Sequence, residues 1–294
     1  MSLLNVHDSL PIPMWTVMRF LIAHKRPISF ARAKAFVNPP SVRGDGKAFD
    51  NAVGNLEEFG LVTRTEDDRL GLSEVAQKLD GNDPKRFNAV LRDAVLHPDR
   101  NTGIGDNDSQ TGPRDLTRAL AWFLSYDPHH IAPNWGEAQA LMARNPIRPE
   151  AGHAVVNDTR WTRFSPWSTA LGLTAPSTLQ ESRLVPDCTT AVKQVVQASW
   201  KAGETVSAVE VLAVLREALP VLPGGAYALA LGLPSPGKHT AGPALSFALL
   251  RGEDEDWIRL ERNADARYSL SVHDPEATHP VPYNSISVLE DLDG

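Results

Sequence analysis

LVTRTEDDRLGL, residues 61–72, places two short apolar runs on either side of a polar turn. This pattern is typical of two antiparallel strands joined by a tight connection. We therefore predict a β-hairpin here, and the sequence before it indicates which kind of domain the hairpin completes.

Three helical patterns precede the hairpin, because apolar residues recur there at spacings of three and four. The first should end at Arg26-Pro27, and the second should stop before Asn38-Pro39-Pro40, since a residue before proline is pushed out of helical geometry. Ser29 is the expected cap of the second helix, and Gly60 is placed to end the third. The positions that define the three stripes are Met14, Val17, Met18, Leu21 and Ile22; Phe30, Ala33 and Phe36; and Phe49, Val53 and Leu56.

Helix, helix, turn, helix and hairpin is the order of a winged helix, so residues 1–80 are predicted to form one. The end of this pattern returns twice, which suggests weakly similar internal repeats. We predict a helical domain at residues 81–186 that ends in a wing-like hairpin, a winged-helix-like domain at 187–272, and a Pro-rich, acidic tail at 273–294. The expected fold class is mainly α with short β-hairpins (α+β), built of tandem winged-helix modules.

Several local signals fix the expected helix starts in the later domains. Asp83 followed by Pro84 reads as an N-cap with proline at the first helical position. Asn134 with Glu137 and Ser207 with Glu210 have the spacing of capping boxes, and Ser165-Pro166 is expected to start another helix. The last hairpin is predicted to pair residues 257–260 with 268–272 around Asn263-Ala264-Asp265.

Composition limits the class of protein. The 294 residues exceed one ordinary domain, and 42% hydrophobic residues can supply real cores. The chain shows no targeting or membrane-spanning segment, and Cys188 is its only cysteine, which together favour the cytoplasm and a buried, inert thiol. The net charge of −7 is concentrated at the end, because residues 253–294 carry −8 and residues 1–252 carry +1.

No recognisable catalytic or metal-binding constellation occurs, so we expect a protein that is not an enzyme and uses no cofactor or metal. The loop from Gly103 to Asp108 lacks the later ligands of a calcium site, and adjacent His129 and His130 lack a third ligand. The tryptophans Trp15, Trp122, Trp161, Trp167 and Trp200 lie on or beside apolar helical stripes, which favours core packing over base stacking.

The first domain is the strongest functional candidate, because the third helix of a winged helix enters the DNA major groove. The candidate nucleic-acid-binding residues are Arg43, Lys47, Asn51, Arg64 and Arg69. Asn55 also lies off the apolar stripe of this helix. Against DNA binding stand the acidic residues of the same helix and hairpin, since residues 1–80 hold ten basic and ten acidic side chains. A surface that docks proteins is therefore an equally good interpretation.

Some short motifs resemble a known family. Leu3-Leu4-Asn5, the predicted winged helix to Leu79, the stretch from Trp167 to Leu173, and the stretch from Leu184 to Ala191 are similar to the DpdG family. That family accompanies bacterial gene clusters that insert 7-deazaguanine derivatives into DNA and act against phage. The resemblance implies an auxiliary subunit that works beside a helicase, nuclease or base-exchange enzyme, and it transfers no catalytic or binding residue.

Three readings follow. The first is a DNA-binding or DNA-sensing subunit with double-stranded DNA as partner, and the second is a scaffold that holds partner proteins of a multi-subunit complex. The third, a transcriptional regulator acting alone, is disfavoured because no dimerising coiled coil or sensing domain is evident. None of them involves a membrane.

Overall fold

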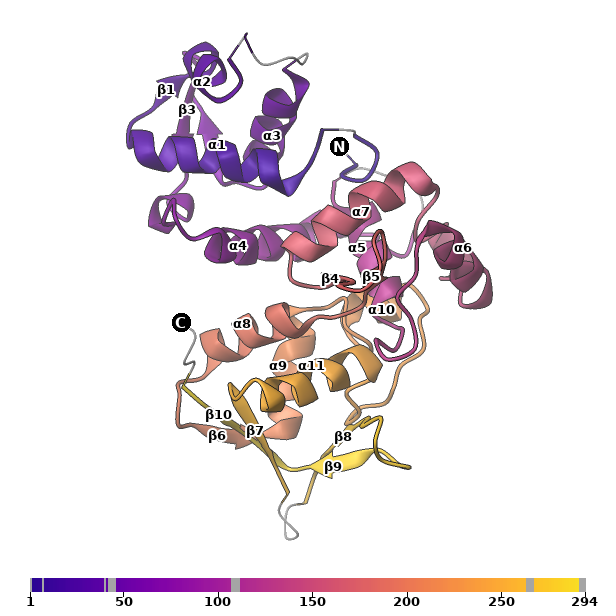
Figure 1. Cartoon of the computed structure of the whole chain (residues 1–294). Coiled ribbons are helices and arrows are strands. Elements are labelled where there is room, and N and C mark those ends of the chain that lie inside the picture. The colour runs from indigo at the N-terminus through magenta and orange to yellow at the C-terminus, as the bar shows by residue number, and fades with distance from the viewer. Residues whose placement is uncertain are drawn as a thin grey trace.

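The computed structural model describes residues 2–6, 8–39, 41, 46–106, 112–262 and 267–290 (Figure 1). This part of the chain is mainly α-helical and contains short antiparallel strands in small sheets, which confirms the predicted α+β class. Three successive units are visible from the indigo N-terminus to the yellow C-terminal strands. Their buried side chains form one continuous core cluster.

The N-terminal unit contains three helices and a three-stranded sheet of order β1-β3-β2. The predicted hairpin is present, with Val62 opposite Leu72 and Arg64 opposite Leu70. A short strand before the second helix, not predicted, pairs Ile28 with Leu70. The elements are α1 (Pro11–His24), β1 (Ile28–Ser29), α2 (Phe30–Val37), α3 (Lys47–Glu58), β2 (Val62–Arg64) and β3 (Arg69–Leu72). The assignment of this unit as a winged helix stays a prediction.

Local signals explain these boundaries. α2 ends at Val37, before the two prolines, as expected. Gly60 follows the end of α3 with φ +71°, and the Leu61 amide donates to the Leu56 carbonyl at 2.8 Å, which closes the helix in a left-handed turn. The stripe of α1 packs against α3, although Ile22 at its end is only half-buried.

The middle unit is helical and ends in a two-stranded hairpin. Asp83 caps α4 by accepting from the Arg86 amide at 2.9 Å, and Asn134 and Glu137 form the predicted capping box of α6. The elements are α4 (Pro84–Leu96), η2 (Pro98–Arg100), α5 (Arg114–Phe123), α6 (Trp135–Arg144), η3 (Pro149–Ala151), α7 (Asp158–Ala170), β4 (Ala175–Pro176) and β5 (Leu184–Val185). One further 3-10 turn, η1 (Ala76–Lys78), precedes this unit.

The helix start predicted at Ser165-Pro166 is wrong. α7 begins at Asp158, capped by Asn157, and Pro166 lies inside the helix. An internal proline removes one helical hydrogen bond, but the longer helix buries Trp161 and Phe164 together with Trp167. Burial of these aromatic side chains outweighs the local preference of proline for the first turn.

The C-terminal unit packs helices α8, α9 and α11 together, with short strands on one side of them (Figure 1). Its elements are α8 (Thr189–Ser199), β6 (Thr205–Ser207), α9 (Ala208–Ala218), α10 (Ala226–Ala230), α11 (Pro243–Asp254), β7 (Ile258–Glu261), β8 (Leu270–Val272), β9 (Val281–Tyr283) and β10 (Ser285–Val288). Ser207 is the N-cap of α9, but its side chain makes no capping hydrogen bond because the residue also ends β6. The predicted capping box is therefore absent.

The strand pairing predicted for this unit is wrong as well. β7 pairs with β10, which also pairs with β6, while β8 pairs with β9. The described part of the predicted tail, residues 273–290, is consequently not a simple tail, because Ile286 and Val288 of β10 are 0% and 3% exposed. Alternating apolar residues reveal a strand but do not identify its partner.

Residues at the start of the chain tie the N-terminal and middle units together. Leu3 and Leu4 are buried, and the Leu4 amide donates to Asp115 of α5 at 2.9 Å. Ser9 is bonded on two sides: its hydroxyl accepts from Asn55 of α3 at 2.6 Å, and its carbonyl accepts from the Trp167 indole of α7 at 2.7 Å. The two units are therefore firmly joined.

The remaining sequence expectations concern isolated residues. Trp122, Trp161 and Trp167 are buried, and Trp15 and Trp200 are half-buried against the core, which confirms their packing role. Cys188 is buried, and burial raises the pKa of its thiol. No helix within the described ranges is both long and apolar enough to cross a bilayer.

Candidate nucleic-acid interface

Arg64 lies on β2 but is engaged by acidic neighbours. Its guanidinium is 2.7 Å from Glu57 and 3.1 Å from Asp68, and it covers the Phe30 ring at 4.5 Å. The hydrogen bond that Arg64 donates to Glu57 raises the pKa of Arg64, and the charge of Asp68 acts in the same direction. This predicted contact residue is thus already neutralised within its own unit.

The other predicted contacts are dispersed. Arg69 donates to the Pro27 carbonyl at 2.6 Å, Lys47 is exposed at the first residue of α3, and Asn51 is half-buried. Arg43 lies outside the described residues. Asn55, expected on the exposed side of α3, is buried instead, where it bonds to Ser9. The described members of this set therefore lie on two parts of the unit, α3 and the hairpin, and both hairpin arginines are engaged by neighbouring groups.

Acidic side chains occupy much of the α3 and hairpin surface. Asp50 holds Lys34 at 2.7 Å, Glu57 holds Arg64, and Glu58 is exposed at the end of α3. Carboxylates at these positions would face a phosphate backbone with the wrong sign. The side of the unit on which a winged helix ordinarily reads DNA is therefore poorly suited to a polyanion.

A strongly basic segment lies on the other elements of the same unit. Residues 9–44 contain six Lys or Arg residues and no Asp or Glu. Those with exposed side chains and no carboxylate partner among the described residues are Arg19, Lys25, Arg26 and Arg32. The summed charge of residues 1–80 hides this separation of basic from acidic residues, because the acidic residues cluster after residue 44. A charge count in shorter windows would have revealed it.

Aromatic rings lie among these cations. Phe36 of α2 stacks on Phe20 of α1, and Phe20 stacks on His24, each pair with ring centroids 5.9 Å apart. The Arg32 guanidinium lies 5.9 Å from the centre of the Phe36 ring. We call Phe20, His24, Arg32 and Phe36, with the flanking Arg19, Lys25 and Arg26, the basic–aromatic face. In Figure 1 α2 lies at the outer end of the N-terminal unit, away from the other units.

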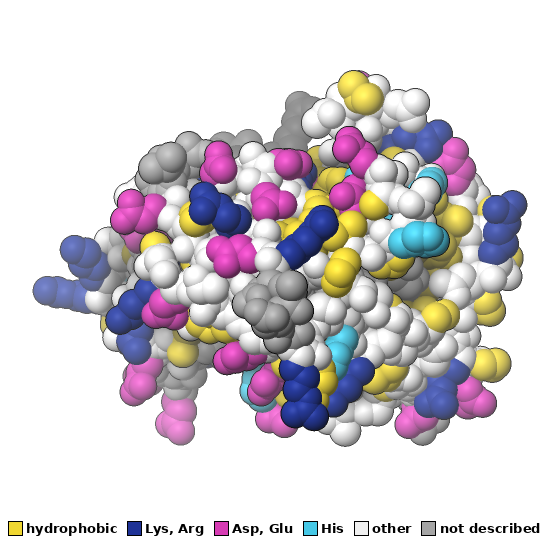
Figure 2. Space-filling model, turned by 90° about the horizontal axis from the view of Figure 1, so that it is seen from below, with side chains coloured by type: hydrophobic (Ala, Val, Ile, Leu, Met, Phe, Trp, Pro, Cys, Tyr) yellow, Lys and Arg dark blue, Asp and Glu magenta, His cyan; other side chains and the backbone are white. Residues whose placement is uncertain are grey.

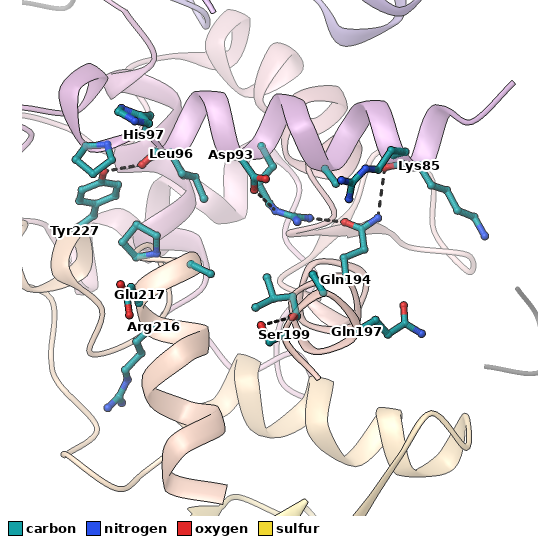
Figure 3. A pocket seen from close by; sticks show the side chains of 18 of the residues that line it. Lys85, Asp93, Leu96, His97, Gln194, Gln197, Ser199, Arg216, Glu217 and Tyr227 are labelled. Carbon is teal, nitrogen blue, oxygen red and sulfur yellow. Dashed lines mark hydrogen bonds and ion pairs between the residues drawn. The ribbon is translucent and has the colours of Figure 1, made fainter. Parts of the chain in front are cut away.

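A groove of about 900 Å³ lies between the middle and C-terminal units (Figure 3). Helix α4 forms one wall, and α8 and the segment from α9 to α10 form the other. Tyr227 spans the groove at one end, where its hydroxyl donates to the Leu96 carbonyl at 2.7 Å. Apolar side chains contribute much of the lining: Ala89, Leu96, Val195, Ala198, Pro220 and Tyr227.

Charged residues of both signs border this groove. Arg92 is 3% exposed and donates to the Gln194 side chain at 2.6 Å, and burial lowers the pKa of Arg92. His97 and Ser199 lie on opposite walls in Figure 3, and the Ser199 hydroxyl is bonded to the Val195 carbonyl at 2.8 Å. An apolar lining with charged borders suits the binding of a partly apolar molecule.

The C-terminal unit has a different surface. Figure 2 shows the face at the bottom of Figure 1, where acidic and basic side chains are interspersed with apolar ones. His130 bonds to Asp127 at 2.8 Å, whereas His129 contacts the Phe247 ring. No cluster of three or more His, Cys, Asp or Glu that could hold a metal occurs in the ranges that the structure describes. This face of the C-terminal unit therefore carries both charge signs.

Comparison with known proteins identifies a family to which the chain is similar. No curated protein and no solved structure matches the chain. A family model described as DpdG-like matches residues 1–266, which span the N-terminal and middle units and the C-terminal unit through β7. This confirms the resemblance seen in the short sequence motifs. Because the match extends over most of its length, the chain belongs to the DpdG-like family.

Proposed function

We propose that this protein is a non-enzymatic subunit of a bacterial DNA-modification and anti-phage system, and that it binds nucleic acid through its N-terminal unit. Membership of the DpdG-like family supports the assignment to a DNA-modification and anti-phage system. The observation that carries the binding role is the polarity of the N-terminal unit, whose residues 9–44 hold six basic and no acidic side chains.

Electrostatics explains why α1 and α2, rather than α3 and the hairpin, would make the contacts. Cations that neutralise phosphates release counterions, and this release drives sequence-independent binding. Arg19, Arg26 and Arg32 are exposed and have no carboxylate to displace among the described residues, whereas Arg64 would first have to leave Glu57. The contact surface proposed here is therefore the basic–aromatic face. A localisation in the cytoplasm, where DNA is accessible, is part of this proposal.

Salt-dependent binding to a DNA duplex tests the proposal. The triple variant Arg19→Gln/Arg26→Gln/Arg32→Gln should bind more weakly, and the slope of log affinity against log salt should flatten by about 0.9 for each lost phosphate contact. Fluorescence anisotropy at several salt concentrations measures both quantities. The matched control is Lys78→Gln/Lys201→Gln/Arg259→Gln, which removes three exposed cations elsewhere. Equal losses in the two triple variants, or no binding of the unaltered protein to either a duplex or a single strand, would overturn the proposal.

A second candidate function, docking of a partner protein, is favoured by the groove between α4 and α8. Its apolar lining and its charged borders suit an amphipathic helix supplied by a protein of the same gene cluster. Ala198 is an exposed residue of the lining, so Ala198→Glu places a charge in the groove. Co-purification with the co-expressed neighbouring gene products should be lost in this variant and kept in Ala213→Glu, on the exposed side of α9. Retention by both variants would exclude the groove.

A further inference from the structure

Phe36 is exposed where its sequence pattern predicts burial. The apolar spacing of α2 groups it with Phe30 and Ala33, yet only Ala33 is fully buried and Phe36 is 63% exposed. A single exposed apolar side chain needs no explanation in general. This ring differs because it is stacked on Phe20 and the Arg32 guanidinium lies over it, 5.9 Å from its centre, within the acid-free segment.

The geometry of the stack leaves an aromatic surface within reach of cations. Phe36, Phe20 and His24 follow one another at centroid separations of 5.9 Å, with interplanar angles of 25° and 14°. Phe36 and His24 are the two exposed ends of this row, and Phe20 between them is half-buried against the core. Arg19, Lys25 and Arg26 are exposed on α1 and directly after it. Alternating aromatic and cationic groups are the arrangement by which proteins hold unpaired nucleotides.

We infer that the basic–aromatic face binds single-stranded nucleic acid, with an unpaired base stacked on Phe36 and the neighbouring phosphates held by Arg19, Arg26 and Arg32. The inference rests on the proposed function and specifies its ligand. Bases inside a duplex are already stacked on each other, so a duplex can use the cations of this face but not the ring. Phe36 thus favours a strand whose bases are unpaired.

The position of the face agrees with this ligand. Reading the sequence of a duplex would require α3 to enter the major groove. Asp50 and Glu58 of α3 are exposed and Glu57 is half-buried, so this helix would bring negative charge to the DNA. The basic–aromatic face needs no groove, because a single strand can pass from the C-terminal end of α1 to α2, and α2 lies at the outer end of the unit (Figure 1). Stacking tolerates any base, so we expect little sequence preference.

Anisotropy with a labelled oligothymidine of about 15 nucleotides, within the usual range of site sizes, and with a duplex of equal length tests the inference. Phe36→Ala should weaken binding of the single strand about tenfold, the loss expected for one stacked base, and change duplex binding less than about twofold. Phe36→Trp should restore the single-strand affinity. Tyr268→Ala is the matched control, because Tyr268 is also exposed, at 54%, with an arginine 5.3 Å from its ring centre.

The outcomes separate the two proposals. Failure of the unaltered protein to bind either ligand overturns both of them. If the arginine triple variant loses duplex affinity while Phe36→Ala leaves the single-strand affinity unchanged, the binding role stands and the stacking role is refuted. Equal losses for single strand and duplex in Phe36→Ala also refute the stacking role. A selective loss that Phe36→Trp reverses, with Tyr268→Ala unchanged, supports it.

Discussion

Glu137 is held at the start of α6 by two kinds of partner. Arg183 donates to both carboxylate oxygens, at 2.6 and 2.8 Å, and the Asn134 amide donates to one of them at 3.1 Å. The hydrogen bond from Arg183 is the main cause of the lowered pKa of Glu137, followed by that from the Asn134 backbone. The ionised carboxylate is thus favoured in the folded state.

This shift predicts how stability depends on pH. Because the folded pKa lies below the unfolded value of about 4.3, the contribution of Glu137 is present above that pH and is lost as the pH falls through the folded pKa. Glu137→Gln should therefore lower the Tm at pH 7, and its difference from the unaltered protein should shrink below about pH 4. Thermal melts followed by circular dichroism measure this, with the exposed Glu181→Gln as control. A difference that is constant with pH would contradict the assignment.

At the same scale, local chemistry made some residues predictable and others not. The caps Asp83 and Asn134 were identified because their hydrogen bonds depend only on residues three positions away. Asn55 was misplaced because its partner, Ser9, lies 46 residues earlier in the chain. Arg64 was placed on the hairpin correctly, but its ion pair with Glu57 depends on how the hairpin folds back on α3.

Among the elements, β10 has the largest consequence for the C-terminal unit. It lies between β6 and β7, and Ile286 faces both Val206 and Leu260 in register. Removing buried atoms from such a position leaves a cavity, so Ile286→Ala should lower the free energy of unfolding by about 2–5 kcal/mol. Urea unfolding measures the loss, and Val281→Ala in the half-buried start of β9 should cost less. A silent Ile286→Ala would show that residues 281–290 behave as a tail.

Helices and strands differed in how far the sequence determined them. The stripes of α1 and α3 follow a period that is complete within each helix, so their positions were predictable. Pairing between β6 and β10 joins residues roughly eighty positions apart, as in Ser207 with Ser285, and no local pattern specifies that choice. The start of α7 was missed because three aromatic residues are buried along it, and burial prevailed over the local signal from Pro166.

For the whole molecule, the class of fold was predictable from the alternation of helical stripes and turns, whereas the surfaces were not. The groove joins α4 to α8 and α10, segments that meet only after the units have packed. The basic–aromatic face could have been located in part from the absence of acids in residues 9–44. Its stack of Phe20 and Phe36 could not be predicted, because it depends on the packing of α1 against α2. The sequence pattern does not show which of the two rings is exposed.

The double attachment of Ser9 also bears on motion. Rotation of the N-terminal unit about Ser9 would break the buried hydrogen bonds of Ser9 with Asn55 and with Trp167. Each buried partner left unsatisfied costs about 1–3 kcal/mol. Free rotation of α2 relative to α7 is therefore opposed at its pivot. Because α2 and α7 are held together in this way, a force that a bound strand exerts on α2 would also move the middle unit.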